Sequence, residues 1–173
     1  CEFLASHQLA RRPGETAEYS NTGFALLGYS LAQVSGKSFE TLLRERVLSP
    51  LGMYQTAISI KSAALNNTTG HNQLQRRVVN GELSAFAPAG GMKSTAKDMM
   101  RYMKANMGQL ETLLAEAIRL SHQVLEHYSA SHSVGFAWFV SRKSGTPNFG
   151  HIGAISGYRA SIRFNKVGDR AKK

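Results

Sequence analysis

The sequence predicts an α+β fold in which a helical region is followed by antiparallel strands. Apolar residues recur at helical spacing in several segments of the first two thirds of the chain, whereas residues 134–164 are rich in aromatic and β-branched residues. The 173 residues are 42% hydrophobic and 18% charged, a globular composition that is long enough to bury a core. We therefore expect one domain over residues 1–173, mainly helical at about 15–130 and built of strands at about 133–165.

Two helices are predicted early in the chain. The first begins at Asn21 and ends at Gly36, which stands where a glycine C-cap is expected. Phe24, Leu27, Leu31 and Val34 recur along it at helical spacing. The small residues Ala25, Gly28 and Ala32 fill neighbouring positions, which suits a helix packed closely on others. The second covers residues 38–48, with Ser38 as its N-cap, and the proline and glycine of residues 50–52 stop it.

The next segments alternate between irregular and helical patterns. Residues 55–88 show no sustained periodicity and predict a long, partly irregular connection with a short strand at 77–79. Thr95 and Asp98 have the spacing of a capping box, which predicts that a helix begins near residue 95. A further helix is predicted over residues 110–127.

Three strands are predicted after the helices. Residues 134–140, 148–152 and 158–164 are separated by short turn segments, a pattern typical of an antiparallel meander. Residues 144–147 predict a turn, and residues 166–173 predict a hairpin turn whose returning strand is not included.

Composition argues against several functions. The formal charge is +10, but the basic residues are scattered and no helix has a basic stripe interleaved with aromatic residues, so we expect no nucleic-acid partner. The single cysteine excludes an internal disulfide, and the six histidines show no metal-ligand spacing, so no metal and no cofactor are expected. No apolar run approaches the roughly 18 residues of a transmembrane segment, and residues 1–6 lack the features of a signal peptide.

Four short motifs occur in an informative order. They are Tyr-Ser-Asn-Thr-Gly at 19–23, Pro-Leu-Gly-Met at 50–53, Pro-Ala-Gly-Gly at 88–91 with Ser-Thr-Ala-Lys-Asp at 94–98, and Gly-His-Ile-Gly at 150–153. Each alone is weak, but together they resemble the class C β-lactamase and penicillin-binding-protein family of serine hydrolases, which includes D,D-peptidases and esterases. The resemblance extends from about Pro13 to Asn165 and implies a serine β-lactamase/D,D-peptidase-like fold.

The resemblance also implies a role for each site residue. A serine hydroxyl needs a nearby base, and Tyr19 would take its proton, with the phenol partly ionised by neighbouring cations. Asn21 would hydrogen-bond the substrate amide, and His151 would supply a donor or a positive charge beside Tyr19. The backbone N–H of Ala154 would donate to the oxyanion, and Gly153 would let substrate approach the strand closely.

The same residues have simpler structural interpretations. A tyrosine followed by Ser-Asn before a helix can be a packed aromatic and an N-cap, and a histidine in a strand is usually a surface or satisfied one. Gly153 and Gly157 could mark a β-bulge. Only the ordered occurrence of the motifs favours the functional interpretation.

Two positions depart from the family pattern. Ile152 stands where the family usually has threonine, which removes a hydroxyl that would help bind a substrate carboxylate. The nucleophile motif Ser-x-x-Lys should precede Tyr19 by many tens of residues, yet only 18 residues lie upstream. Ser94-Thr95-Ala96-Lys97 matches that motif literally, but it follows Tyr19 and coincides with a helix start, so we do not predict Ser94 as the nucleophile.

The sequence therefore predicts a C-terminal portion of a serine hydrolase that acts through an acyl-enzyme on a β-lactam, a D-Ala-D-Ala-type peptide or an ester. The chain as given would be inactive because it has no Ser-x-x-Lys ahead of the tyrosine. The alternative is a non-catalytic, penicillin-binding-like relative that only binds ligands. By resemblance, the expected location is periplasmic or otherwise extracytoplasmic, with roles in the cell wall or antibiotic resistance.

Overall fold

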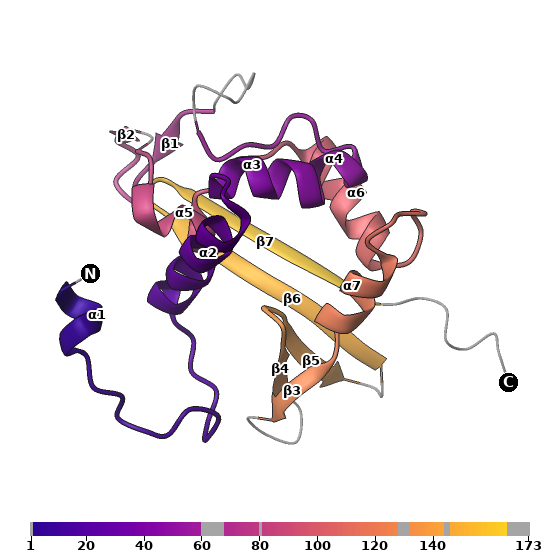
Figure 1. Cartoon of the computed structure of the whole chain (residues 1–173). Coiled ribbons are helices and arrows are strands. Elements are labelled where there is room, and N and C mark those ends of the chain that lie inside the picture. The colour runs from indigo at the N-terminus through magenta and orange to yellow at the C-terminus, as the bar shows by residue number, and fades with distance from the viewer. Residues whose placement is uncertain (1, 60–67, 80, 128–131, 144–145, 166–173) are drawn as a thin grey trace, which may run out of the picture.

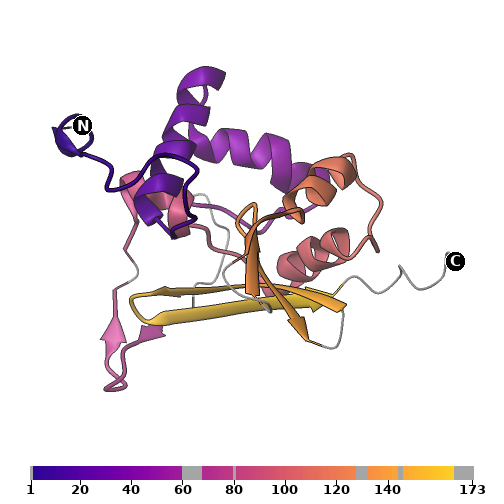
Figure 2. The same cartoon turned by 90° about the horizontal axis from the view of Figure 1, so that it is seen from below.

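The computed structural model of the chain describes residues 2–59, 68–79, 81–127, 132–143 and 146–165. Its main helices lie on one side of the long strands β6 (Thr146–Ile155) and β7 (Tyr158–Asn165), as Figures 1 and 2 show from two directions. The predicted α+β class is confirmed. Within the described ranges, no helix is both long and apolar enough to cross a lipid bilayer.

Helix α2 (Asn21–Ser35) begins and ends where the sequence predicts. The side-chain oxygen of Ser20 accepts a hydrogen bond from the Gly23 N–H at 3.0 Å, which makes Ser20 the N-cap. Gly36 adopts the left-handed conformation with φ of 65°, and its N–H donates to the Gln33 carbonyl. Both caps are local interactions, which is why sequence spacing could predict them.

Most of the large apolar residues that recur along α2 lie at the surface. Leu27 and Leu31 are about half exposed, and Val34 is 90% exposed. The helix packs through Gly28, which is buried against the side chain of Pro88. The close packing predicted for the small residues is confirmed at Gly28, where close approach of the backbone decides which side of this helix is covered.

Replacing Gly28 by valine is expected to lower the free energy of unfolding by about 1–3 kcal/mol, because overpacking forces elements apart. Even the first added carbon would lie 2.3 Å from Cγ of Pro88. Urea unfolding measures the change. Ser30→Val, at an exposed position of the same helix, is the matched control, and equal stability of the two variants would contradict the packing argument.

A second continuous helical segment follows α2. It consists of α3 (Phe39–Leu43), the π-helical turn η1 (Arg44–Leu48) and α4 (Ser49–Leu51). Ser38 is its N-cap, as predicted, and accepts a hydrogen bond from the Thr41 N–H at 3.1 Å. The segment runs to residue 51, three residues further than predicted, and ends at Gly52 with φ of 66°.

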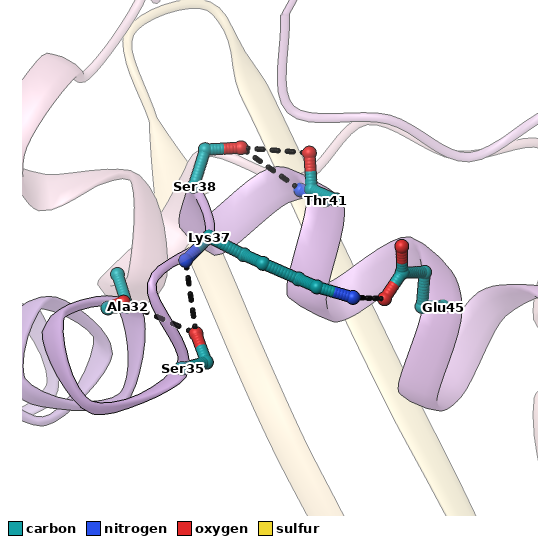
Figure 3. A network of polar contacts seen from close by, with 6 residues as sticks. All are labelled: Ala32, Ser35, Lys37, Ser38, Thr41 and Glu45. Atoms are coloured by element: carbon teal, nitrogen blue, oxygen red, sulfur yellow. Dashed lines mark hydrogen bonds and ion pairs between the residues drawn. The ribbon is translucent and has the colours of Figure 1, made fainter.

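Polar contacts hold the junction between α2 and α3 (Figure 3). The Lys37 ammonium bonds the Glu45 carboxylate at 2.5 Å, and the Lys37 N–H donates to the Ser35 hydroxyl at 3.3 Å. The Ser38 hydroxyl bonds the Thr41 hydroxyl at 2.9 Å. The hydrogen bond from Lys37 lowers the pKa of the Glu45 carboxyl, so the ion pair is lost as the pH falls through the folded-state pKa of that group.

Short elements occupy the predicted irregular connection. They are β1 (Gly70–His71), β2 (Arg77–Val78), the 3-10 helix η2 (Ser84–Phe86) and α5 (Ala87–Gly90), while α1 (Glu2–Ser6) lies at the N-terminus. The short strand predicted at 77–79 is confirmed as β2, which pairs antiparallel with β1. Residues 60–67 and 80 of this connection lie outside the described residues.

Helix α6 (Ala96–Asn106) begins at the predicted cap. The Asp98 N–H donates to the Thr95 hydroxyl at 3.2 Å. The Asp98 carboxylate is buried and accepts hydrogen bonds from the Gln55 N–H and the Thr56 hydroxyl, both at 2.8 Å. Asp98 therefore ties the preceding loop to the start of α6.

The helix predicted over residues 110–127 is wrong in its extent. α7 covers only Ala115–Ser121, and β3 (Val124–His127) follows it after a short connection. β3 pairs antiparallel with β4 (His132–Gly135). Pairing with a neighbouring strand outweighs the helical spacing of the apolar residues here.

The single strand predicted over residues 134–140 is also wrong, because the chain turns within it. β4 ends at Gly135, and β5 (Phe139–Lys143) begins after a turn. In that turn Ala137 has φ of 64°, and the Gly135 N–H donates to the Trp138 carbonyl at 2.9 Å. Alanine rarely adopts positive φ, so no sequence pattern marked the turn.

The sheet contains five antiparallel strands in the order β3–β4–β5–β6–β7, which confirms the predicted meander. β6 is longer than the predicted 148–152, whereas β7 matches the predicted 158–164 closely. Residues 144–145 of one predicted turn, and the predicted hairpin at 166–173, lie outside the described residues.

Two buried clusters form the core. The first contains Leu48, Leu51, Met53 and Ala105, and the second contains Trp138, Val140, Phe149 and Phe164. In the second, the Phe164 ring meets the edge of Trp138 at 5.0 Å and stacks on Phe149 at 5.5 Å. This cluster anchors β6, the strand that contains the His-Ile-Gly motif.

Candidate active site

Segments that are far apart in the sequence meet at one pocket of about 610 Å³. Tyr19, just before α2, and Phe139, at the start of β5, line it together with residues 151–154 of β6 and 159–161 of β7. Five of the six predicted site residues therefore line a single pocket, and the sixth, Asn21, is hydrogen-bonded to Tyr19.

The pocket follows an unpaired stretch of β6. β5 pairs with β6 only as far as Gly150, which lies opposite Phe139. Among the described strands, residues 151–155 of β6 pair with β7 alone. This half of β6 therefore presents a backbone edge to the pocket.

The register decides which backbone groups face that edge. Ile155 and Tyr158 flank a two-residue turn, so they exchange both backbone hydrogen bonds. Hydrogen-bonded pairs alternate with non-hydrogen-bonded pairs along an antiparallel ladder. The backbone groups of Ile152 and Ala154 therefore point away from β7, and the Ala154 N–H faces the pocket edge where the oxyanion donor is predicted.

Three rings surround the tyrosine end of the pocket. The Tyr19 ring centroid lies 6.1 Å from that of His151 and 6.3 Å from that of Phe139. The rings of Phe139 and His151 stack at 5.5 Å. Sequence reasoning missed Phe139, because only the pairing of β5 with β6 brings it to the site.

The hydroxyl of Tyr19 is fixed by its own loop. It donates a hydrogen bond to Oδ1 of Asn21 at 3.0 Å, its only hydrogen-bond partner among the residues the structure describes. Ser20 between them is extended, with φ of −143° and ψ of 113°, which places the side chains of its two neighbours on the same side. Ser20 therefore caps the helix, and Tyr19 and Asn21 of the predicted site flank this cap.

The strand motif leaves room for a ligand. A Cβ at Gly153 would meet no atom within 4 Å, and Ile152 is 65% exposed. Gly157 lies in the β6–β7 turn with φ of 80° and does not mark a bulge. The pocket is therefore open at Gly153 and apolar at Ile152.

Ser94 belongs to a structural network. Its hydroxyl bonds the Thr56 hydroxyl at 2.8 Å, and Thr56 in turn bonds the buried Asp98 carboxylate. Ser94 does not line the pocket, and Lys97 is exposed. The arrangement agrees with the prediction that this Ser-x-x-Lys is a helix start. Within the described ranges, no group of three or more His, Cys, Asp or Glu side chains could hold a metal ion.

Solved structures share this fold. A class C β-lactamase superposes with a TM-score of 0.81 at 24% identity and covers 94% of this chain and 53% of its own. A D-alanine carboxypeptidase AmpC from Burkholderia cenocepacia superposes with a TM-score of 0.81 at 21% identity, over 94% of this chain and 56% of its own. The fold is that of the class C β-lactamases and D-alanine carboxypeptidases.

The family model "Beta-lactamase" matches residues 1–171, and the chain belongs to this family. The D-alanyl-D-alanine-carboxypeptidase/endopeptidase AmpH of Escherichia coli K12 is 27% identical over 96% of this chain and 47% of its own length. A β-lactamase of Pseudomonas fluorescens is 34% identical over 64% of this chain and 32% of its own. The chain thus spans at most about half the length of these curated relatives.

Proposed function

We propose that the protein containing this chain is a serine hydrolase that acts through an acyl-enzyme on a β-lactam, a D-Ala-D-Ala-type peptide or an ester. One observation supports this most: the Tyr19 hydroxyl, the His151 ring and the outward-facing Ala154 N–H meet at one open pocket of a chain in the beta-lactamase family. The named activities of its relatives are consistent with this chemistry.

In the proposed mechanism, the nucleophilic serine comes from a Ser-x-x-Lys segment outside residues 1–173. The phenolate form of Tyr19 accepts the serine proton as the serine oxygen attacks the substrate carbonyl, and His151 supplies a donor or positive charge beside that phenolate. The Ala154 N–H donates to the oxyanion that forms on the carbonyl oxygen. Tyr19 then returns its proton to the leaving group, and water hydrolyses the acyl-enzyme.

Asn21 and the strand motif position the substrate in this proposal. Asn21 exchanges its hydrogen bond with Tyr19 for one with the substrate amide. Gly153 allows the substrate backbone to lie along the β6 edge. Such chemistry on cell-wall peptides or antibiotics implies an extracytoplasmic location.

Turnover assays of the full-length protein test the proposal. A chromogenic cephalosporin, a D-Ala-D-Ala peptide and a p-nitrophenyl ester represent the three substrate classes, and hydrolysis of at least one is expected. Failure of folded protein to turn over all three would contradict the proposal. Saturable binding of the cephalosporin without turnover would then support the alternative of a ligand-binding relative, whose pocket needs no nucleophile.

A further inference from the structure

Arg159 is a charged residue of the pocket that the proposed mechanism does not use. It lies on β7 directly opposite Ala154 and lines the pocket. Among the residues that the structure describes, it has no hydrogen bond or ion pair, and its side chain is exposed. Its guanidinium is therefore available to a ligand.

The register brings this cation close to the β6 edge. Ala154 and Arg159 form a non-hydrogen-bonded pair, in which facing side chains approach most closely. Neighbouring strands lie about 4.8 Å apart, which is less than the length of an extended arginine side chain. The Ala154 side chain is only a methyl group, so the Arg159 side chain is long enough to extend across β6 to the edge where substrate would lie.

The proposed mechanism sets the direction of the substrate along this edge. The leaving group must lie near Tyr19 and His151 to receive its proton, while the carbonyl oxygen lies at the Ala154 N–H. The carbonyl oxygen and the leaving-group atom share one carbon, so the scissile bond lies at the Ala154 N–H, and the leaving group extends from there toward His151, about 10 Å back along the strand. The acyl part therefore extends past Ala154, away from His151, and Arg159 is the cation beside it.

We propose that Arg159 binds a carboxylate on the acyl part of the substrate, so that the pocket favours acyl donors with an anionic group there. This inference rests on the proposed function. A guanidinium presents parallel N–H donors that match both oxygens of a carboxylate. Ile152, its diagonal neighbour across the strands, has no hydroxyl and offers an apolar contact beside that charge.

A second arginine on the same strand provides a matched control. Arg163 is four residues further along β7, so it lies on the same face of the strand, but it does not line the pocket. Its side chain covers Gly150, where an added Cβ would lie 3.1 Å from Cγ of Arg163. Neutralising either residue removes the same charge, but only Arg159 lies beside the proposed acyl site.

The test compares acylation of the full-length protein by benzylpenicillin and carbenicillin, which differ by one carboxylate on the acyl side chain. Arg159→Gln is expected to lower the carbenicillin-to-benzylpenicillin ratio of acylation rate constants by about two- to fivefold. Arg159→Lys should restore part of it, and Arg163→Gln should leave it unchanged. An unchanged ratio in Arg159→Gln, or an equal fall in Arg163→Gln, would overturn the inference while the proposed function stands. Absence of acylation by both penicillins would overturn this inference, whereas the proposed function fails only if the D-Ala-D-Ala peptide and the ester are not turned over either.

Discussion

Replacing Tyr19 by phenylalanine is expected to lower the acylation rate of the full-length protein by about 10²–10⁴-fold, the usual contribution of a positioned general base. The variant keeps the ring that packs beside Phe139 and His151 and loses only the hydroxyl that bonds Asn21. Stopped-flow measurement of acylation by a chromogenic cephalosporin gives the rate.

Tyr29→Phe is the matched control for this variant. Tyr29 lies on α2, is 58% exposed and does not line the pocket, so removal of its hydroxyl should leave acylation unchanged. The role proposed for Tyr19 is wrong if Tyr19→Phe acylates at the wild-type rate, or if its loss is matched by Tyr29→Phe. Thermal unfolding of both variants separates a chemical effect from a loss of fold.

Replacing Phe164 by alanine is expected to lower the free energy of unfolding by about 3–5 kcal/mol, as for other large-to-small changes of buried aromatic residues. Phe164 is 4% exposed and packs against Trp138, Phe149 and His122. The cavity would lie directly beside β6, so we expect the pocket edge to lose order together with global stability.

Phe136→Ala provides the comparison, because Phe136 is 55% exposed and lies in the turn between β4 and β5. Phe136→Ala is expected to lower the free energy of unfolding, measured in urea, by no more than about 0.5 kcal/mol. Similar costs for the two variants would show that the second core cluster does not determine stability, contrary to the packing described above.

Local signals predicted the helix ends that have a capping residue well. Ser20, Ser38, Thr95 and Gly36 cap helices as their spacing indicates, because a cap depends on neighbours within a few residues. The strand predicted at residues 158–164 is likewise confirmed as β7, in which Tyr158, Ile162 and Phe164 are less exposed than the arginines at 159 and 163.

Interactions between residues that are distant in the sequence explain which structural predictions failed. The strand β3 and the turn at Ala137 are determined by pairing within the sheet, which no local pattern contains. The small side of α2 could be predicted to pack closely, but its partner Pro88, 60 residues further along the chain, could not.

The candidate site likewise contains residues that the sequence could predict and residues that it could not. Its motif residues, such as Tyr19 and His151, could be found from order and spacing along the chain. Phe139 and Arg159 could not, because only the registers of β5 and β7 against β6 bring them to the pocket.

The central claim is that the pocket belongs to an acyl-enzyme hydrolase whose serine lies outside this chain. Intact-mass spectrometry and peptide mapping after incubation of the full-length protein with benzylpenicillin test it most directly. The account predicts one penicilloyl adduct, on a serine of a Ser-x-x-Lys segment outside residues 1–173, and none on the chain of 173 residues alone. An adduct on Ser94 or another residue of this chain would contradict it.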